Sequence, residues 1–305
     1  MCQSLKGTYV FKQNGVEIGR SENLITTNGR TSILQYLSGL RQDWAADMAI
    51  GALSTTPSIS DVELNFETAR YPVTLKTFLP ATSNNPDLIV VRTLLPEDLV
   101  ANIYEIGLYP SRAVSGVNSS IIADFSDLSQ WHTVTGTTET VPYLPQVDSS
   151  PRIGSNSVTL EQSTKYTNDN LSLSFSHYTP LDKIEILLHN SVAGSLYVQL
   201  VDVVGNTQTL TLPIQTNSDY FKVSASFDQN LGFASTDTSI VNFQYLTSLS
   251  IATDASAAAT IDAIKVSTAA EQAIEDSILS KSVLTTPIAK IYNVPIDVEY
   301  YVEML

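Results

Sequence analysis

The stretch "IDVEYYVEML" (residues 296–305) decides how the rest of the chain is interpreted. Its apolar residues alternate with acidic residues and tyrosine, so that Ile296, Val298, Tyr300, Val302 and Met304 share one face of an extended chain. A period of two is typical of a β-strand with one buried face and one solvated face. A strand needs neighbours for its backbone N–H and C=O groups. The sequence therefore has to supply partner strands elsewhere.

Composition restricts the class of protein. The chain has 305 residues, of which 43% are hydrophobic and only 15% charged. The length and the hydrophobic content are typical of a folded protein long enough for two domains, whereas the charged content lies well below the usual quarter. The net charge of −15 argues against a nucleic-acid groove and against docking on anionic membranes. Cys2 is the only cysteine, which excludes an intrachain disulfide and a cysteine-based zinc site.

Neither a signal peptide nor a membrane span is evident. The N-terminal residues lack the apolar core of a signal peptide, and no run of about eighteen apolar residues occurs. We therefore expect synthesis in a cytoplasm, without secretion by the general route and without membrane insertion.

The first hundred residues predict a sheet with one or two short helices. Asn14-Gly15 lies between two alternating stretches, which indicates a β-hairpin. Helical spacing of apolar residues in 31–40 predicts an amphipathic helix, with Asn28 or Thr31 as its N-cap. Ser60 with Glu63 predicts a further helical turn. Several proline-punctuated strand patterns follow, up to about residue 110.

The pattern changes between about residues 118 and 268. Short strand-like segments such as "KIEILLHN" and "GSLYVQLVDVVG" follow one another, edged by Ser, Thr, Asn, Asp or Gly. Many strands without helices indicate a β-sandwich, and a jelly roll is one form of it. Residues 270–305 return to the style of the N-terminal part. The chain ends of one domain usually lie close together, so the sandwich can be an insertion. Composition leaves an alternative open, in which three consecutive pieces follow one another and the tail packs on the second domain.

A resemblance favours the insertion. Scattered short motifs resemble the N-terminal domain of phage tail-fibre and baseplate-attachment proteins. The matching residues are Thr26, Gly29, Arg30, Ile50, Gly51, Asp61, Leu64, Tyr71, Pro72, Ile103, Glu105, Ile106, Gly107 and Leu108. In that family a closing segment follows the "EIGL" motif almost at once, whereas here residues 277–302 look like that segment after a long interruption. The resemblance implies a discontinuous docking domain (1–113 plus 270–305) and an inserted domain (118–268).

The inserted segment carries a second resemblance. "IIADFSDLSQWHTV" and "TIDAIKV" are similar to the first and last strands of galactose-binding-like jelly rolls, which are common in carbohydrate-binding modules. That resemblance implies a calcium ion between the two strands, with Asp127 and Asp262 as ligands beside Asp124. Ser126 stands where the family commonly has a glutamate, so one favoured ligand is missing.

Aromatic residues of the insertion are candidates for contact with a glycan, because a flat ring can pack against the apolar face of a sugar. We single out Trp131 and Tyr143, with Tyr166, Tyr178 and Tyr197 as further candidates. In the alternative interpretation, Trp131 packs inside the sandwich and the tyrosines are ordinary strand residues.

No motif indicates catalysis. His132, His177 and His189 are the only histidines and lie in separate strand contexts, and no known nucleophile, metalloprotease or nucleotide-binding signature occurs. We therefore expect a mainly β, non-enzymatic protein of a bacteriophage virion, from its tail, baseplate or fibre-attachment apparatus. Its expected partners are other virion proteins and further copies of itself, as a trimer or ring. The alternatives are a glycan-binding adhesion protein for host polysaccharide and a fibre that decorates the capsid or neck.

Overall fold

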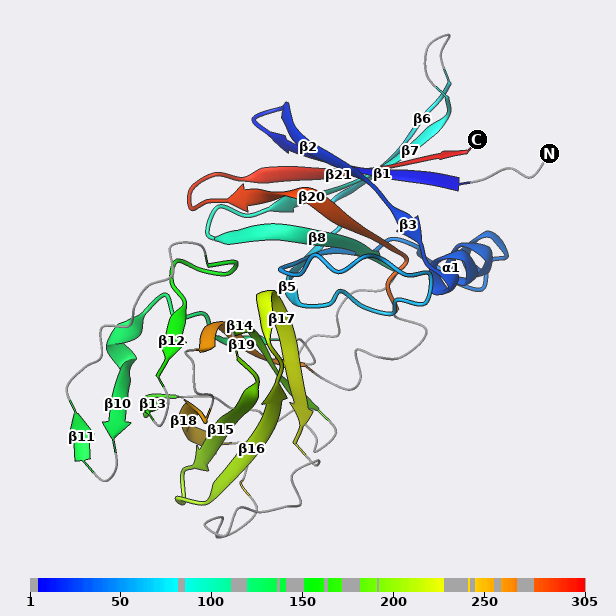
Figure 1. Cartoon of the computed structure of the whole chain (residues 1–305). Coiled ribbons are helices and arrows are strands. Elements are labelled where there is room, and N and C mark those ends of the chain that lie inside the picture. The colour runs from blue at the N-terminus through cyan, green and yellow to red at the C-terminus, as the bar shows by residue number, and fades with distance from the viewer. Residues whose placement is uncertain are drawn as a thin grey trace. The chain divides into compact units, whose positions relative to one another are not determined.

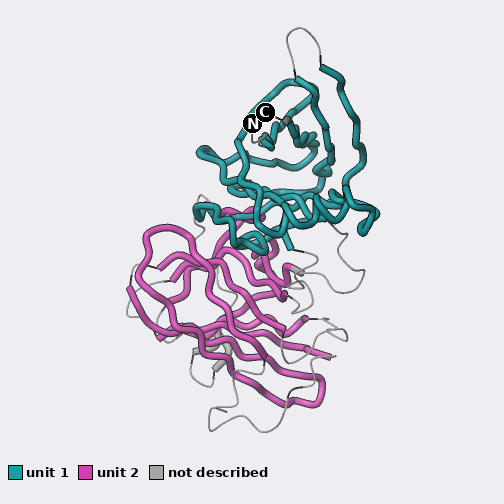
Figure 2. The backbone as a smooth tube through the Cα atoms, turned by 90° about the vertical axis from the view of Figure 1, so that its right-hand side faces the viewer, with its two compact units in different colours: residues 1–114, 270–305 teal, residues 115–269 magenta. Residues whose placement is uncertain are grey.

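The protein is mainly β and divides into two compact units in the computed structural model (Figures 1 and 2). Unit 1 contains residues 1–114 and 270–305, and unit 2 contains residues 115–269. The structure describes residues 5–81, 86–110, 120–135, 138–140, 151–161, 164–171, 182–190, 192–227, 241, 245–254, 259–267 and 277–304. Within these residues, no helix is long and apolar enough to cross a membrane.

The C-terminal strand lies in the middle of an N-terminal sheet. Sheet A of unit 1 has the order β2, β1, β21, β7, β6 (Val16–Glu22, Leu5–Gln13, Ile296–Met304, Leu88–Leu95, Leu75–Leu79). Strand β21 pairs antiparallel with β1 on one edge and with β7 on the other. The partners that "IDVEYYVEML" needs are therefore supplied by two segments from the first hundred residues.

The hairpin predicted at Asn14-Gly15 joins β2 to β1. Both residues have positive φ (51° and 78°), the backbone conformation of a type I′ turn, in which glycine is favoured because it has no Cβ.

Sheet B of unit 1 is also built from both ends of the chain. Its order is β3, β20, β8, β4, β5 (Leu24–Ile25, Ser280–Lys290, Ala101–Tyr109, Asp47–Gly51, Glu67–Pro72). One hydrophobic core joins the two sheets, with Tyr9, Phe11 and Val298 from sheet A and Ile50 and Ile106 from sheet B. The apolar face of β21 is buried in this core, which explains the alternation in its sequence.

The single described α-helix, α1 (Thr27–Leu37), begins and packs differently from the prediction. Its N-cap is Thr26, not Asn28 or Thr31, and the Thr26 Oγ1 accepts a hydrogen bond from the Gly29 N–H at 2.9 Å. The buried side of the helix consists of Gly29 and Ser32. A Cβ atom on Gly29 would overlap with the carbonyl oxygen of Leu279, so this glycine allows the helix to approach the C-terminal segment closely.

The apolar side of α1 is largely solvent-accessible. Leu34 and Leu37 are 66% and 73% exposed. They line an apolar pocket of about 520 Å³ together with residues of sheet A, among them Ile89 and Val302. The helical turn predicted at Ser60 is absent: residues 59–60 form a turn, in which the Asp61 carboxylate accepts the Ser58 N–H at 3.0 Å.

Unit 2 is a β-sandwich of two antiparallel sheets. Sheet C has the order β12, β19, β14, β17, with β9 also paired to β19 (Val158–Leu160, Ala259–Ser267, Lys183–Asn190, Asn217–Ser226, Ser120–Ala123). Sheet D has the order β11, β10, β13, β18, β15, β16 (Thr138–Thr140, Trp131–Thr135, Lys165–Asn168, Leu246–Thr253, Gly194–Asp202, Thr207–Ile214). A short 3₁₀ helix, η1 (Leu128–Gln130), precedes β10. Alternate residues of both sheets fill one core, including Ile186 and Ile264 from sheet C and Val198 and Ile251 from sheet D.

Candidate functional site

Of the two aromatic residues singled out as glycan contacts, only Trp131 lies within the described residues. Trp131 is 7% exposed and belongs to the core of unit 2, with its ring centroid 5.1 Å from that of Phe125. Its ring therefore has no exposed face on which a sugar can stack. Trp131 packs inside the sandwich, as the alternative interpretation expected. Tyr143 lies outside the described residues, as does Tyr178. Tyr166 is 1% exposed and also belongs to the core.

The aspartates singled out as calcium ligands accept hydrogen bonds from nearby groups. Asp127 is the N-cap of η1 and accepts the Ser129 N–H at 3.0 Å. Asp262 is fully buried and accepts the N–H groups of Arg152 and Ile153 at 2.9 and 3.1 Å. No group of three His, Cys, Asp or Glu residues that could hold a metal ion occurs among the described residues. Asp262 therefore fixes the segment that follows residue 150, and a calcium ion shared by Asp127 and Asp262 stays a prediction.

The outward face of sheet D carries a continuous row of polar side chains. Five neighbouring strands each contribute one residue to it, and the cross-strand register places these residues directly opposite one another. We call them the polar row: His132 on β10, Thr167 on β13, Ser250 on β18, Gln199 on β15 and Thr209 on β16.

Hydrogen bonds fix much of the polar row. The hydroxyl groups of Thr167 and Ser250 lie 3.0 Å apart, and both residues are buried. The Gln199 amide donates to Thr209 Oγ1 at 3.5 Å and accepts from Lys165 Nζ at 2.7 Å. Small hydroxyl residues therefore occupy the centre of the row, and longer, partly exposed side chains flank them.

Charge at the polar row is balanced locally. Burial lowers the pKa of Lys165, an effect that the negative charge of Asp169 opposes. The same Asp169 lies 3.3 Å from the Nε2 atom of His132. This face therefore offers a ligand hydrogen-bonding groups with little net charge.

Tyr197 supplies the aromatic ring beside the polar row. It lies two residues before Gln199 on β15 and therefore on the same face of sheet D. Its hydroxyl group donates to the Asp254 carboxylate at 2.9 Å, and Asp254 also accepts the Ser195 N–H at 2.6 Å. These two donors lower the pKa of Asp254, with the backbone N–H as the larger effect. The ring is thus held at its hydroxyl end and remains partly exposed.

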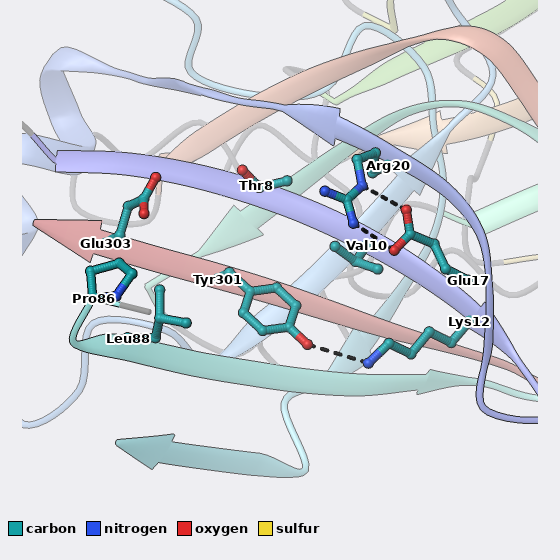
Figure 3. Close-up of a pocket in the computed structure, with 9 residues that line it drawn as sticks. All are labelled: Thr8, Val10, Lys12, Glu17, Arg20, Pro86, Leu88, Tyr301 and Glu303. Atoms are coloured by element: carbon teal, nitrogen blue, oxygen red, sulfur yellow. Dashed lines mark hydrogen bonds and ion pairs between the residues drawn. The ribbon is translucent and has the colours of Figure 1, made fainter. Parts of the chain in front are cut away.

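A pocket lies on the outer face of sheet A in unit 1 (Figure 3). Its volume is about 390 Å³, within the range of ligand sites. Its lining residues are Thr8, Val10, Lys12, Glu17, Arg20, Pro86, Leu88, Tyr301 and Glu303. The ring of Tyr301 and the side chain of Leu88 provide its apolar part, and charged groups surround them.

Most charged groups of this pocket already form ion pairs. Lys12 contacts Glu299 at 2.5 Å, and Arg20 contacts Glu17 at 2.6 Å. The Glu299 carboxylate raises the pKa of Lys12. Burial opposes ionisation of Glu299, but the hydrogen bonds from Lys12 and Tyr301 outweigh it and lower its pKa. A ligand would have to displace these ion pairs, so we regard the polar row as the better candidate.

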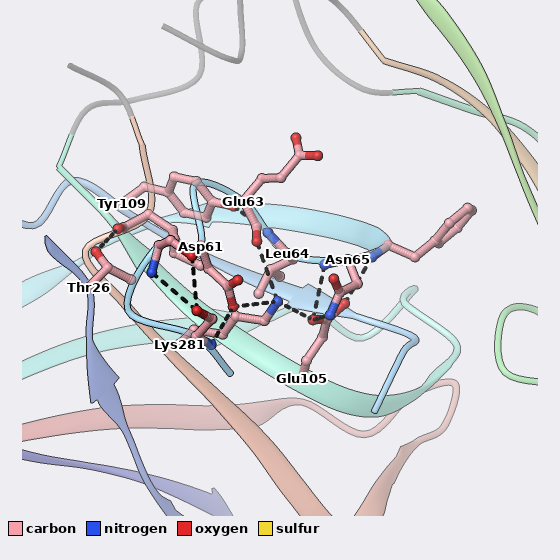
Figure 4. A network of polar contacts seen from close by, with 12 residues as sticks. Thr26, Asp61, Glu63, Leu64, Asn65, Glu105, Tyr109 and Lys281 are labelled. Carbon is pink, nitrogen blue, oxygen red and sulfur yellow. Dashed lines mark hydrogen bonds and ion pairs between the residues drawn. The ribbon is translucent and has the colours of Figure 1, made fainter. Parts of the chain in front are cut away.

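A third polar cluster is buried inside unit 1 and contains several residues of the tail-protein motifs (Figure 4). The Glu105 carboxylate accepts the N–H groups of Asn65 and Phe66 at 3.1 and 2.9 Å. Lys281 Nζ lies 3.3 Å from both Glu105 and Asp61. Burial raises the pKa of Glu105, an effect that Lys281 opposes.

This cluster joins the two parts of unit 1. Lys281 lies on β20, after the long interruption in the sequence, whereas Glu105 lies on β8, before it. Thr26 acts at the same junction, because its Oγ1 donates to the carbonyl oxygen of Ile278 at 2.6 Å. The motif residues Thr26, Gly29, Asp61 and Glu105 therefore have structural contacts here, and none of them faces a ligand pocket given above.

Comparison with known proteins yields distant structural likenesses only. No protein-family model matches the chain, and no curated protein matches its sequence. A family 11 carbohydrate-binding module of a Clostridium thermocellum cellulase is 13% identical, covers 50% of this chain and 96% of its own, and gives a TM-score of 0.36. A C. thermocellum xylanase (its CBM22-1 and GH10 modules) is 12% identical over 49% of this chain, which spans 28% of the xylanase chain, with a TM-score of 0.30.

Another similar structure is the enzymatically active domain of tailspike protein 4 from bacteriophage CBA120. It is 9% identical over 52% of this chain and 20% of its own, with a TM-score of 0.22. At these scores the likenesses carry no argument about ligands or partners.

Sequence analysis missed most of the polar row. It named Tyr197 as a candidate aromatic and noted His132 as a histidine in a strand context. Thr167, Ser250, Gln199 and Thr209 are common polar residues in strands, and nothing in their local sequence distinguishes them. The available signal was the alternation of each strand, which assigns them to the outward face but not to one row.

Proposed function

We propose that the protein is a non-enzymatic glycan-binding protein and that the outward face of sheet D holds the glycan. The observation that carries this proposal is the polar row, in which five adjacent strands each place one polar side chain on the same face and His132, Gln199 and Thr209 are partly exposed. Neighbouring strands lie about 4.8 Å apart, so the row extends over roughly 19 Å. That length suits a chain of several sugar residues, whose hydroxyl groups present donors and acceptors along its length.

Tyr197 adds the apolar component that sugar recognition requires. A sugar ring has an apolar C–H face, and an aromatic side chain binds it by burying that face. Because the Tyr197 hydroxyl is held by Asp254, little side-chain entropy is lost when a ligand packs on the ring. The low net charge of the face favours a neutral polysaccharide over a strongly anionic one.

Binding is tested on the full chain with an array of neutral bacterial polysaccharides, followed by calorimetric titration of those retained. We expect Tyr197→Ala and Gln199→Ala each to weaken binding about tenfold, which corresponds to roughly 1.4 kcal/mol. The control is Ser224→Ala, since Ser224 is exposed on β17 of the other sheet. The proposal fails if no polysaccharide binds, or if these variants bind as well as the control. Release of reducing sugar during the titration would contradict the non-enzymatic role.

We also propose that unit 1 is the docking platform of a phage virion component. The support is the resemblance of its motif residues to phage tail-fibre and baseplate-attachment proteins, together with the convergence of Thr26, Gly29 and Glu105 on one buried junction. Mass spectrometry and antibody labelling of intact particles test this role. Absence of the chain from purified particles would exclude it, without affecting the glycan proposal.

A further inference from the structure

Strand β6 is the last strand of sheet A and has one free edge. It pairs with β7 over five consecutive residues without a register shift, and no strand among the described residues pairs with its other edge. The backbone N–H and C=O groups along such an edge form a template for another strand.

This edge is unusually apolar. Leu75, Phe78 and Leu79 are 47%, 61% and 43% exposed. Natural edge strands are commonly protected by charges, prolines or bulges. The only charge within β6 belongs to Lys76, and its ammonium group is engaged by Asp43. The strand therefore lacks most of the features that discourage pairing with a further strand.

The sequence of β6 suits pairing with a second copy of the same strand. In "LKTFL" (75–79) both ends are leucine, placed symmetrically about Thr77. Antiparallel pairing about a two-fold axis at Thr77 opposes all five residues and places Leu75 of one copy against Leu79 of the other. Opposed residues are both odd-numbered or both even-numbered, so their side chains lie on the same face. The two faces of one sheet therefore continue into the corresponding faces of the other.

The second face of the paired strands is complementary as well. Lys76 of each copy would lie opposite Phe78 of the other, so that the aliphatic part of Lys76 packs on the ring while its ammonium group stays with Asp43. Leu94 and Ile89 on β7 are 47% and 38% exposed and extend the apolar surface on the two faces. A two-fold contact is self-complementary, as the commonest protein dimers are.

We propose that two copies of this chain associate through antiparallel pairing of β6 with β6, about a two-fold axis at Thr77. The contact is small compared with that of stable dimers, so the association is weak and depends on concentration. Each copy carries a net charge of −15, which opposes association at low ionic strength. Salt therefore strengthens the dimer. This inference is independent of the glycan proposal and of a virion location.

Cross-linking tests the axis directly. Residues opposed in an antiparallel pair have Cα atoms about 4.5–5.5 Å apart, within the range that a disulfide spans. In a Cys2→Ser background, we expect Thr77→Cys to form a disulfide-linked dimer under mild oxidation. Thr55→Cys, at an exposed position outside β6, is the matched control and should remain monomeric over the same time. Equal rates of cross-linking would overturn the proposal.

Sedimentation equilibrium tests the energetics. We expect the wild-type dimer to tighten between low salt and about 0.5 M salt, as charge repulsion is screened. The variant Leu75→Lys with Leu79→Lys should weaken association at least tenfold at the higher salt. An unchanged association constant in this variant, or a larger oligomer that forms equally well with it, would refute the pairing. Circular dichroism of the variant verifies that unit 1 remains folded.

Discussion

The ammonium group of Lys281 lies 3.3 Å from the carboxylate of Glu105, and both side chains are buried. One residue precedes unit 2 in the sequence and the other follows it. The contact helps to close unit 1 around its interruption, together with the strand pairing of β20 with β8 and of β21 with β1.

Lys281→Met should destabilise unit 1 by about 3–5 kcal/mol, because Glu105 would be left in the interior without its cation. Urea unfolding measures this, and the two tryptophans allow each unit to be followed separately, since Trp44 belongs to unit 1 and Trp131 to unit 2. The matched control is Lys76→Met, which removes a partly exposed ion pair with Asp43 and should cost less than about 1 kcal/mol. Equal losses in the two variants would contradict the importance of the buried contact.

Gly29→Ala should destabilise unit 1, although alanine is the better helix former by about 1 kcal/mol. The added Cβ would overlap with the carbonyl oxygen of Leu279, so α1 would have to move away from the C-terminal segment. Thr31→Ala, on the exposed side of the same helix, is the control and should change the unfolding free energy by no more than about 0.5 kcal/mol. A more stable Gly29→Ala variant would show that the close approach is unimportant.

Unit 2 should lose stability in acid through Glu185. Burial alone would raise the pKa of Glu185, but Lys265 and Lys222 outweigh burial and lower the pKa from 4.5 to about 2. Because the folded pKa lies below the unfolded one, the stabilisation is fully present above about pH 4.5 and is lost as the pH falls toward 2. The loss should amount to roughly 3 kcal/mol.

The matched variant for this pH effect is Glu185→Gln, which cannot ionise. Its unfolding free energy, followed by the fluorescence of Trp131, should be lower at neutral pH and should vary less between pH 4.5 and 2. A variant with the same pH profile as the wild type would assign the acid sensitivity to other carboxylates.

Trp131→Ala should mainly lower the stability of unit 2, whereas Tyr197→Ala should mainly weaken glycan binding. The first removes a buried ring packed on Phe125 and should cost about 3–5 kcal/mol. The second removes a partly exposed ring and should cost less than about 1 kcal/mol while impairing glycan binding. Thermal unfolding and titration of both variants measure the two effects, and a stable Trp131→Ala protein with specific loss of binding would restore Trp131 as a sugar contact.

Asp262→Ala should destabilise unit 2 by about 1–3 kcal/mol, because the N–H groups of Arg152 and Ile153 lose their buried acceptor. The melting temperature of the wild type, measured with calcium and with a chelator, tests the calcium site implied by the jelly-roll resemblance. An unchanged melting temperature would exclude the site, and a rise with calcium that disappears in Asp262→Ala would confirm it.

The helix illustrates the limit of local patterns. Apolar spacing in 31–40 predicted a helix, and α1 covers Thr27–Leu37, yet the side that packs against the protein is formed by Gly29 and Ser32. The N-cap prediction failed for the same reason. The hydroxyl group of the N-cap Thr26 also donates a hydrogen bond to the carbonyl oxygen of Ile278. That residue lies outside any sequence window around the helix.

Local sequence patterns were enough to predict the mainly β fold, the turn at Asn14-Gly15 and the buried face of the C-terminal strand. These features depend on residues within a few positions of one another, through the period of a strand and the φ angles that a turn requires. Three-dimensional packing was needed to bring Lys281 to Glu105 and to place Trp131 in the core. It also aligns the residues of the polar row, which are His132, Thr167, Ser250, Gln199 and Thr209. Alternation fixes the face on which a side chain lies, whereas strand order and register fix its neighbours, and these arise from packing between segments far apart in the chain.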